Sequence, residues 1–142
     1  MDVQVMSHFD LVENSELLIA AMGHWPSFHD AKVLSISRLQ NSCVAAFHVF
    51  QMTHEVDPQG HFILRNHHRV EMSMLGVHGD SLPRQYTGDV LSALSIRRDG
   101  DLISVDFESH MANDGSIVCE RVRLISVDPC DGDGRRLTDI RD

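Results

Sequence analysis

Histidine is the residue type with the widest chemical scope in this chain, since ten histidines occur among 142 residues. Their spacing matches no known metal motif: His24 and His29 flank a proline, and the adjacent His67 and His68 would face opposite sides of a strand. The sequence has no Cys/His cluster of the zinc type. A site could still assemble in space from His29, Asp30 and either His67 or His68. Surface or hydrogen-bonded histidines are the alternative interpretation.

His29 and Asp30 also resemble half of a general acid–base pair, because a carboxylate beside an imidazole can orient the ring for proton transfer. Neighbours in sequence rarely serve each other in this way. In a turn, the Asp30 carboxylate is expected to accept hydrogen bonds from backbone N–H groups instead. Nucleophile elbows, P-loops and glycine-rich dinucleotide turns are absent from the sequence. We therefore expect a protein that is not an enzyme and has no catalytic residue, bound metal or cofactor.

Two further groups of residues suggest chemistry only weakly. Residues 131–134 (DGDG) hint at a calcium loop, but no glutamate follows at the required place and no flanking helices are expected. Cys43, Cys119 and Cys130 are odd in number and widely spaced, which argues against a disulfide framework. Cys43 and Cys119 lie in apolar runs and are expected to be buried free thiols.

The most distinctive segment is residues 25–31, with the sequence WPSFHDA. We take Trp25, Pro26, Phe28, His29 and Asp30 as its structural signature. Pro26 turns the chain. Trp25 and Phe28 would then pack beneath a preceding helix as a staple that sets the angle between helix and sheet. The alternative is that Trp25 is exposed as an anchor for a partner protein.

The elements that must position this segment are one helix and a series of strands. The helix is expected over residues 12–22, with Asn14 or Ser15 as its cap and Gly23 as its end. Strands are expected over 32–39, 61–64 resuming at 69, 102–108 and 117–127. Residues 43–52 are apolar on both faces and predict a central strand covered on both sides, with Met52 as core filler. Turn signals lie at 57–60, 98–101 and 113–115. Residues 90–96 are compatible with a short helix or a strand.

These elements predict an α+β, mainly β domain. Six or seven strands joined by hairpin turns would form an antiparallel sheet or sandwich with one N-terminal helix. We expect a single globular domain over residues 1–128. Residues 129–142 are rich in glycine and mixed charge, and are expected to be a flexible C-terminal tail.

Composition limits the partners. Hydrophobic residues make up 42% of the chain, and no apolar run is long enough to span a bilayer. The N-terminus carries acidic residues and does not have the pattern of a secretory signal, so a cytoplasmic protein is expected. The formal net charge of −9 repels nucleic acid and would attract a basic partner. The alternative is that the acidity serves solubility alone.

Residues 25–31, followed by VLSI at 33–36, resemble the opening motif of the bacterial immunity protein 50 family. The order of later segments is also similar to that family: FHVFQM at 47–52, VEMSMLGV at 70–77, DVLSALSI at 89–96, VDFES at 105–109 and GSIVCERV at 115–122. The resemblance extends from about residue 23 to residue 130.

The resemblance implies a cytoplasmic protein that binds a cognate protein toxin and neutralises it by occlusion. It implies no catalytic residues and does not indicate which residues bind the partner. Two alternatives remain open: a small enzyme or metal-dependent module centred on His29 and Asp30, and a homodimer formed through an edge strand.

Overall fold

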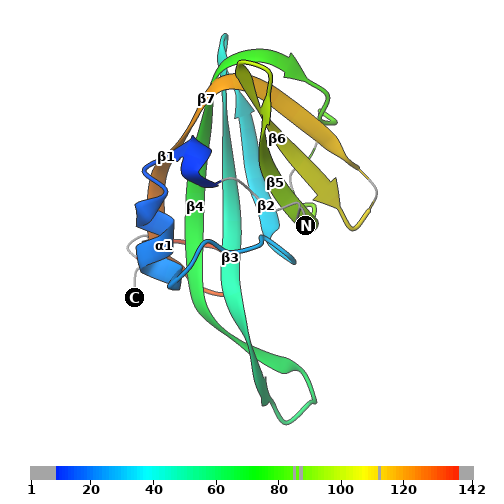
Figure 1. Ribbon diagram of the computed structural model, residues 1–142. Helices are drawn as coiled ribbons and strands as arrows, with labels where there is room; N and C mark the ends of the chain where they lie inside the picture. The colour runs from blue at the N-terminus through cyan, green and yellow to red at the C-terminus, as the bar shows by residue number, and fades with distance from the viewer. Residues whose placement is uncertain (1–8, 85, 87, 112, 138–142) are drawn as a thin grey trace, which may run out of the picture.

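The computed structural model describes residues 9–84, 86, 88–111 and 113–137. Within this part of the chain the protein is mainly β, with a 3-10 helix η1 (Phe9–Leu11) and one α-helix, α1 (Glu16–Met22) (Figure 1). The predicted class, an α+β and mainly β domain with an N-terminal helix, is confirmed. No helix in the described ranges has the length and apolar character needed to cross a bilayer.

In the described residues seven strands form one sheet, and six of them follow the order β2-β3-β4-β7-β6-β5, in which all neighbours are antiparallel. A short strand, β1, pairs in parallel with β7 outside this path. The strands are β1 (Val12–Glu13), β2 (Lys32–Arg38), β3 (Ser42–Val56), β4 (Phe62–Asp80), β5 (Leu91–Asp99), β6 (Leu102–Ser109) and β7 (Gly115–Pro129). The ambiguous residues 90–96 are therefore extended: Val90 forms an isolated bridge, and residues 91–96 belong to β5. The alternating apolar residues that predicted the strands are buried, including Val70, Met72 and Met74 in β4.

The start of the helix differs from the prediction of residues 12–22. Val12 pairs with Val122 of β7 and is buried, so the chain is still extended at this point. Asn14 adopts a positive φ of 64°, and its side-chain amide donates a hydrogen bond to the Leu124 carbonyl, at 3.2 Å. The helix therefore begins only at residue 16. Helical periodicity alone could not reveal that Val12 and Glu13 would pair with β7 instead of joining the helix.

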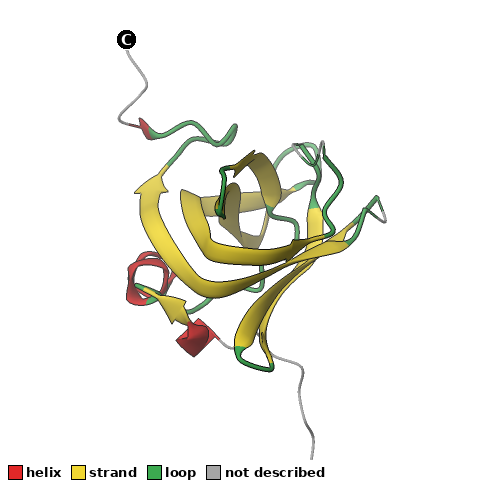
Figure 2. Cartoon of the chain, turned by 90° about the horizontal axis from the view of Figure 1, so that it is seen from above, coloured by secondary structure: helices red, strands yellow, loops and turns green. Residues whose placement is uncertain are grey.

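The sheet curls until its two outer strands meet, as seen from above in Figure 2. Lys32 at the start of β2 forms an antiparallel bridge with Val90, just before β5. Four backbone hydrogen bonds of 2.7–2.8 Å join residues 30–33 to residues 88–91. The edges that a strand-mediated homodimer would use are therefore paired with each other over these residues.

β3 and β4 extend well beyond the rest of the sheet, as Figure 1 shows at its lower end. Pairing of β2 with β3 ends at His48, and pairing of β7 with β4 ends at His68. Beyond these residues β3 and β4 pair only with each other, up to the turn at residues 57–60. The strand predicted over 61–64 and resuming at 69 is continuous in β4. The expected break is a bulge at Asn66, which has a φ of 58°.

Residues 129–137 are not the loose tail expected from their composition. Cys130 is buried and bridges to Arg136, while the Asp131 carboxylate accepts hydrogen bonds from the backbone N–H groups of Asp133 and Arg135. Gly134, at a φ of 83°, lies so close to the Leu34 side chain that a Cβ would meet it at 3.0 Å.

Local turn chemistry and the absence of a side chain at Gly134 therefore let this segment pack on the sheet. The expected domain boundary after residue 128 lies within β7. Residues 138–142 of the expected tail, and residues 1–8 of the expected domain, lie outside the described residues.

Candidate functional site

The segment 25–31 forms a corner between α1 and β2. The helix ends at Gly23, whose φ of 84° and hydrogen bond to the Ile19 carbonyl match the predicted cap. Pro26 and Phe28 are buried, and the half-buried Trp25 packs against the core.

Ring contacts continue from the corner into the sheet. Trp25 stacks on Phe9 of η1 at a centroid distance of 5.8 Å, and Phe28 contacts Phe47 of β3 edge-on at 5.3 Å. These contacts tie the corner to both the N-terminal segment and the sheet.

The backbone of the corner is held in an uncommon conformation. Phe28 and Asp30 both have positive φ values, 64° and 67°, which are rare outside glycine and cost about 1–3 kcal/mol each. The Ala31 N–H donates to the Phe28 carbonyl at 3.0 Å across this turn. As a result, Phe28 points into the core while His29 remains exposed and Asp30 half-exposed.

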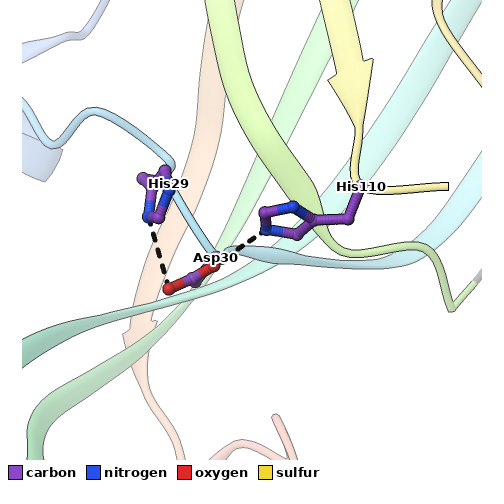
Figure 3. Close-up of side chains that lie close together, drawn as sticks. All are labelled: His29, Asp30 and His110. Carbon is purple, nitrogen blue, oxygen red and sulfur yellow. Dashed lines mark hydrogen bonds and ion pairs between the residues drawn. The ribbon is translucent and has the colours of Figure 1, made fainter. Parts of the chain in front are cut away.

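Asp30 lies between two imidazoles, as Figure 3 shows. Its Oδ1 is 2.9 Å from His110 Nε2, and its Oδ2 is 3.3 Å from His29 Nδ1. The prediction that His67 or His68 would join His29 and Asp30 was wrong. The third residue of the group is His110. The expected role of the Asp30 carboxylate as a backbone acceptor is also corrected, since both of its oxygens face imidazoles. We name His29, Asp30 and His110 the corner cluster.

The closure of the sheet brings the corner cluster together. The backbone N–H of Asp30 donates to the Leu91 carbonyl at 2.8 Å, and that of His110 donates to the adjacent Val90 carbonyl at 2.9 Å. Two successive carbonyls before and within β5 therefore hold two residues that are 80 positions apart in sequence. No local pattern could predict this contact, because it depends on the meeting of β2, β5 and the end of β6.

The corner cluster offers two imidazole nitrogens and a carboxylate, which are the donors of transition-metal sites and of proton-transfer dyads. A pocket of about 460 Å³ opens beside it, lined by corner residues that include His24, His29 and Asp30 and by β3 residues that include Phe50 and Met52. Exposed side chains and an adjoining pocket make the cluster accessible to an ion or small molecule.

The other candidate histidines lie elsewhere on β3 and β4. His67 Nδ1 is 2.8 Å from Nε2 of the buried His48, and His68 is buried with its Nδ1 3.0 Å from the Asn66 carbonyl. Burial, and secondarily the neighbouring His67, lowers the pKa of His48 below the ordinary value of 6.5. These histidines therefore belong to the packing of the sheet.

A second surface feature lies on the projecting part of β3 and β4. Met52 is paired with Leu64 and Val56 with Phe62, and their exposed fractions are 53%, 36%, 56% and 54%. Phe62 and Leu64 are two apart on β4 and share a face, and each shares that face with its cross-strand partner. The four side chains therefore lie on one face, with an irregularity of β3 between Met52 and Val56. We name these four residues the ribbon patch. Met52 was expected to be core filler on a strand covered on both sides. It is exposed because, among the described residues, β3 pairs only with β4 at this point.

Charge on the described surface is organised by ion pairs. The pairs that neutralise arginines include Arg38–Asp80, Arg97–Asp106, Arg121–Glu13, Arg123–Glu13 and Arg136–Asp128. The hydrogen bond from Arg121 lowers the pKa of Glu13 to about 2, so this carboxylate stays charged well into acidic pH. These pairs neutralise charge locally, while the 21 acidic residues still exceed the 12 basic ones and give the net charge of −9.

No protein-family model, curated protein or solved structure matches this chain. Its function is therefore inferred from its own residues and their arrangement.

Proposed function

We propose that this protein is a toxin-neutralising immunity protein, which works in the cytoplasm by binding a protein toxin and occluding it, without catalysis. The observation that carries this proposal is the ribbon patch, an exposed apolar surface on a projecting two-stranded hairpin. The resemblance of residues 25–31 to the immunity protein 50 family supplies the class of partner.

The ribbon patch has the properties of a protein-binding element. Its four apolar side chains are exposed within the described part of the chain. Exposed clusters of apolar side chains are uncommon on monomeric proteins and are characteristic of interaction surfaces. Phe62 is the aromatic member of the patch, and aromatic side chains often dominate binding energy. A narrow hairpin can enter a cleft that a flat sheet face could not reach, which suits inhibition by occlusion.

The charge of the protein supports the same proposal. A net charge of −9 would speed encounter with a toxin whose working surface is basic, as surfaces that bind nucleic acid or phosphate are. Apolar contact would then supply the lasting affinity, while the charge would set the association rate. Association would consequently slow with rising salt, while dissociation would change much less.

The direct test is co-expression with the product of a candidate toxin gene adjacent to the gene for this chain, followed by purification of the complex. We expect restored growth of the host cell and a stoichiometric complex. Failure to restore growth, with no complex at micromolar concentration, would contradict the proposal for that toxin.

The contact surface is tested with Phe62→Ser, which removes the aromatic member of the ribbon patch. We expect affinity for the toxin to fall at least about thirtyfold, corresponding to about 2 kcal/mol for a dominant interface residue. Leu39→Ser is the matched control, because Leu39 is 63% exposed in the separate turn between β2 and β3. Equal affinities for the two variants would place the toxin contact elsewhere.

A further inference from the structure

We propose that the corner cluster is a binding site for a divalent metal ion of the zinc class, with His29 Nδ1, His110 Nε2 and a carboxylate oxygen of Asp30 as ligands. This inference does not rest on the proposed toxin binding. It rests on the positions of three side chains and on the chemistry of their donor atoms.

The first argument is distance. The three donor atoms lie within 4.8 Å of one another. Ligands around tetrahedral zinc, at about 2.0–2.1 Å from the ion, are about 3.4 Å apart. Each imidazole is already near that spacing from one oxygen of the carboxylate: Asp30 Oδ1 lies 2.9 Å from His110 Nε2, and Asp30 Oδ2 lies 3.3 Å from His29 Nδ1. Small rotations of the exposed histidine rings would therefore bring all three donors onto one ion.

The second argument is the donor set. Two imidazoles and one carboxylate suit zinc and its neighbours Co²⁺ and Ni²⁺, whereas Ca²⁺ and Mg²⁺ prefer sites built entirely from oxygen. Three protein ligands leave the fourth position of a tetrahedral ion open. Because His29 and Asp30 also line the pocket of about 460 Å³, water or a small anion could reach that position.

The third argument is rigidity. Adjacent carbonyls of Val90 and Leu91 hold the backbones of His110 and Asp30, and the Ser27 hydroxyl lies 3.2 Å from the backbone nitrogen of His29. Ligands on a backbone that is already held lose less entropy when an ion binds.

Other histidine–carboxylate pairs are less complete. His78 contacts Glu120 at 2.9 Å, but this pair contains a single imidazole. Among the described residues, the corner cluster is the one group of three histidine, cysteine or acidic side chains close enough to share an ion. The His78–Glu120 pair therefore provides a matched comparison.

An ion at this position would also fasten the fold. It would connect the corner, which precedes β2, to the turn after β6, and so reinforce the closure of the sheet. In the metal-free protein the His110 ring N–H can donate to Asp30, and the His29 ring lies within ion-pair distance of the same carboxylate. The ion would occupy the ring nitrogens instead, and any proton displaced from them would pass to solvent.

The test is titration of the tag-free protein with Zn²⁺ by calorimetry and with Co²⁺ by visible absorption. We expect one ion per chain, a Co²⁺ spectrum of the tetrahedral or five-coordinate type, and a higher melting temperature with Zn²⁺. Asp30→Asn and His110→Ala should each weaken binding at least about tenfold, since even residues that only support a ligand contribute tenfold or more.

His78→Ala should bind as the wild type does. Asn tolerates the positive φ of Asp30, so Asp30→Asn is expected to fold, and circular dichroism checks this. The proposal is overturned if the wild type binds no Zn²⁺ at micromolar to millimolar concentration. It is also overturned if both cluster variants keep wild-type affinity, which would identify adventitious binding at other histidines.

Discussion

The buried histidine pair on β3 and β4 makes the stability of the protein depend on pH. His48 is only 6% exposed, and its ring nitrogen lies 2.8 Å from that of His67. Burial, and then the neighbouring imidazole, favours the neutral form and lowers the pKa of His48 in the folded protein. Below the ordinary value of 6.5, the unfolded chain therefore takes up this proton more readily than the folded one. The stability that His48 contributes is complete above about pH 6.5 and is lost as the pH falls toward the lowered pKa.

We predict that His48→Gln reduces the loss of stability between about pH 7 and pH 5.5, because glutamine removes the titrating ring and retains a polar group near His67. The measurement is urea unfolding of both proteins across this range. The difference between the two proteins at about pH 8, where the ring is neutral in both states, serves as the baseline. Identical slopes of stability against pH would contradict the role given to His48.

At the scale of single elements, the packing of β7 at its first residue, Gly115, requires that this residue has no side chain. Gly115 pairs with Phe107 of β6 and passes beneath the segment that follows β4. A Cβ at this position would lie 2.8 Å from the Ser81 carbonyl oxygen and 2.9 Å from the Leu82 Cα, both of which are backbone atoms. The close approach of three chain segments therefore requires glycine here.

Gly115→Ala is accordingly expected to destabilise the protein by about 1–3 kcal/mol, as overpacking against backbone usually does. Chemical unfolding measures this change. Gly132→Ala is the control: a Cβ there meets nothing within 4 Å, and its effect should stay within about 0.5 kcal/mol. Equal stabilities of the two variants would show that the 81–82 segment moves away at little cost.

At the scale of the whole molecule, local stability is expected to be high where the two outer strands of the sheet meet. It is expected to be low where β3 and β4 project beyond the other strands. Backbone N–H groups of Asp30, Val33, Gly88 and Leu91 bond across the closure, next to the core. In the projecting part, β3 and β4 pair only with each other, so each strand has one partner, and the apolar face is exposed. Isolated two-stranded ribbons are marginally stable in water.

Hydrogen exchange should therefore show slow exchange at these four amides and faster exchange at the amides of residues 53–56 and 62–64. Binding of a partner to the ribbon patch should slow the second group specifically. Rapid exchange at the closure would indicate that the two outer strands separate readily in solution.

Much of the architecture could be predicted from local signals. Alternation in β4 and β6 correctly identified the buried residues Val70, Met72, Ile103, Val105 and Phe107. Gly23 marked the end of the helix, and residues 57–60, 98–101 and 113–115 marked turns between paired strands. These signals succeed because they describe how a few adjacent residues arrange their own backbone and which face they bury.

The sequence by itself thus determined a mainly antiparallel β domain with one short helix and a distinctive corner. Only the tertiary structure decided that His110, rather than His67 or His68, joins His29 and Asp30. It also decided that Met52 is exposed and that residues 130–137 pack on the sheet. The physical reason is the same in each case: these outcomes depend on which distant strands meet and where a strand loses its neighbours, and neither is encoded in the local spacing of residue types.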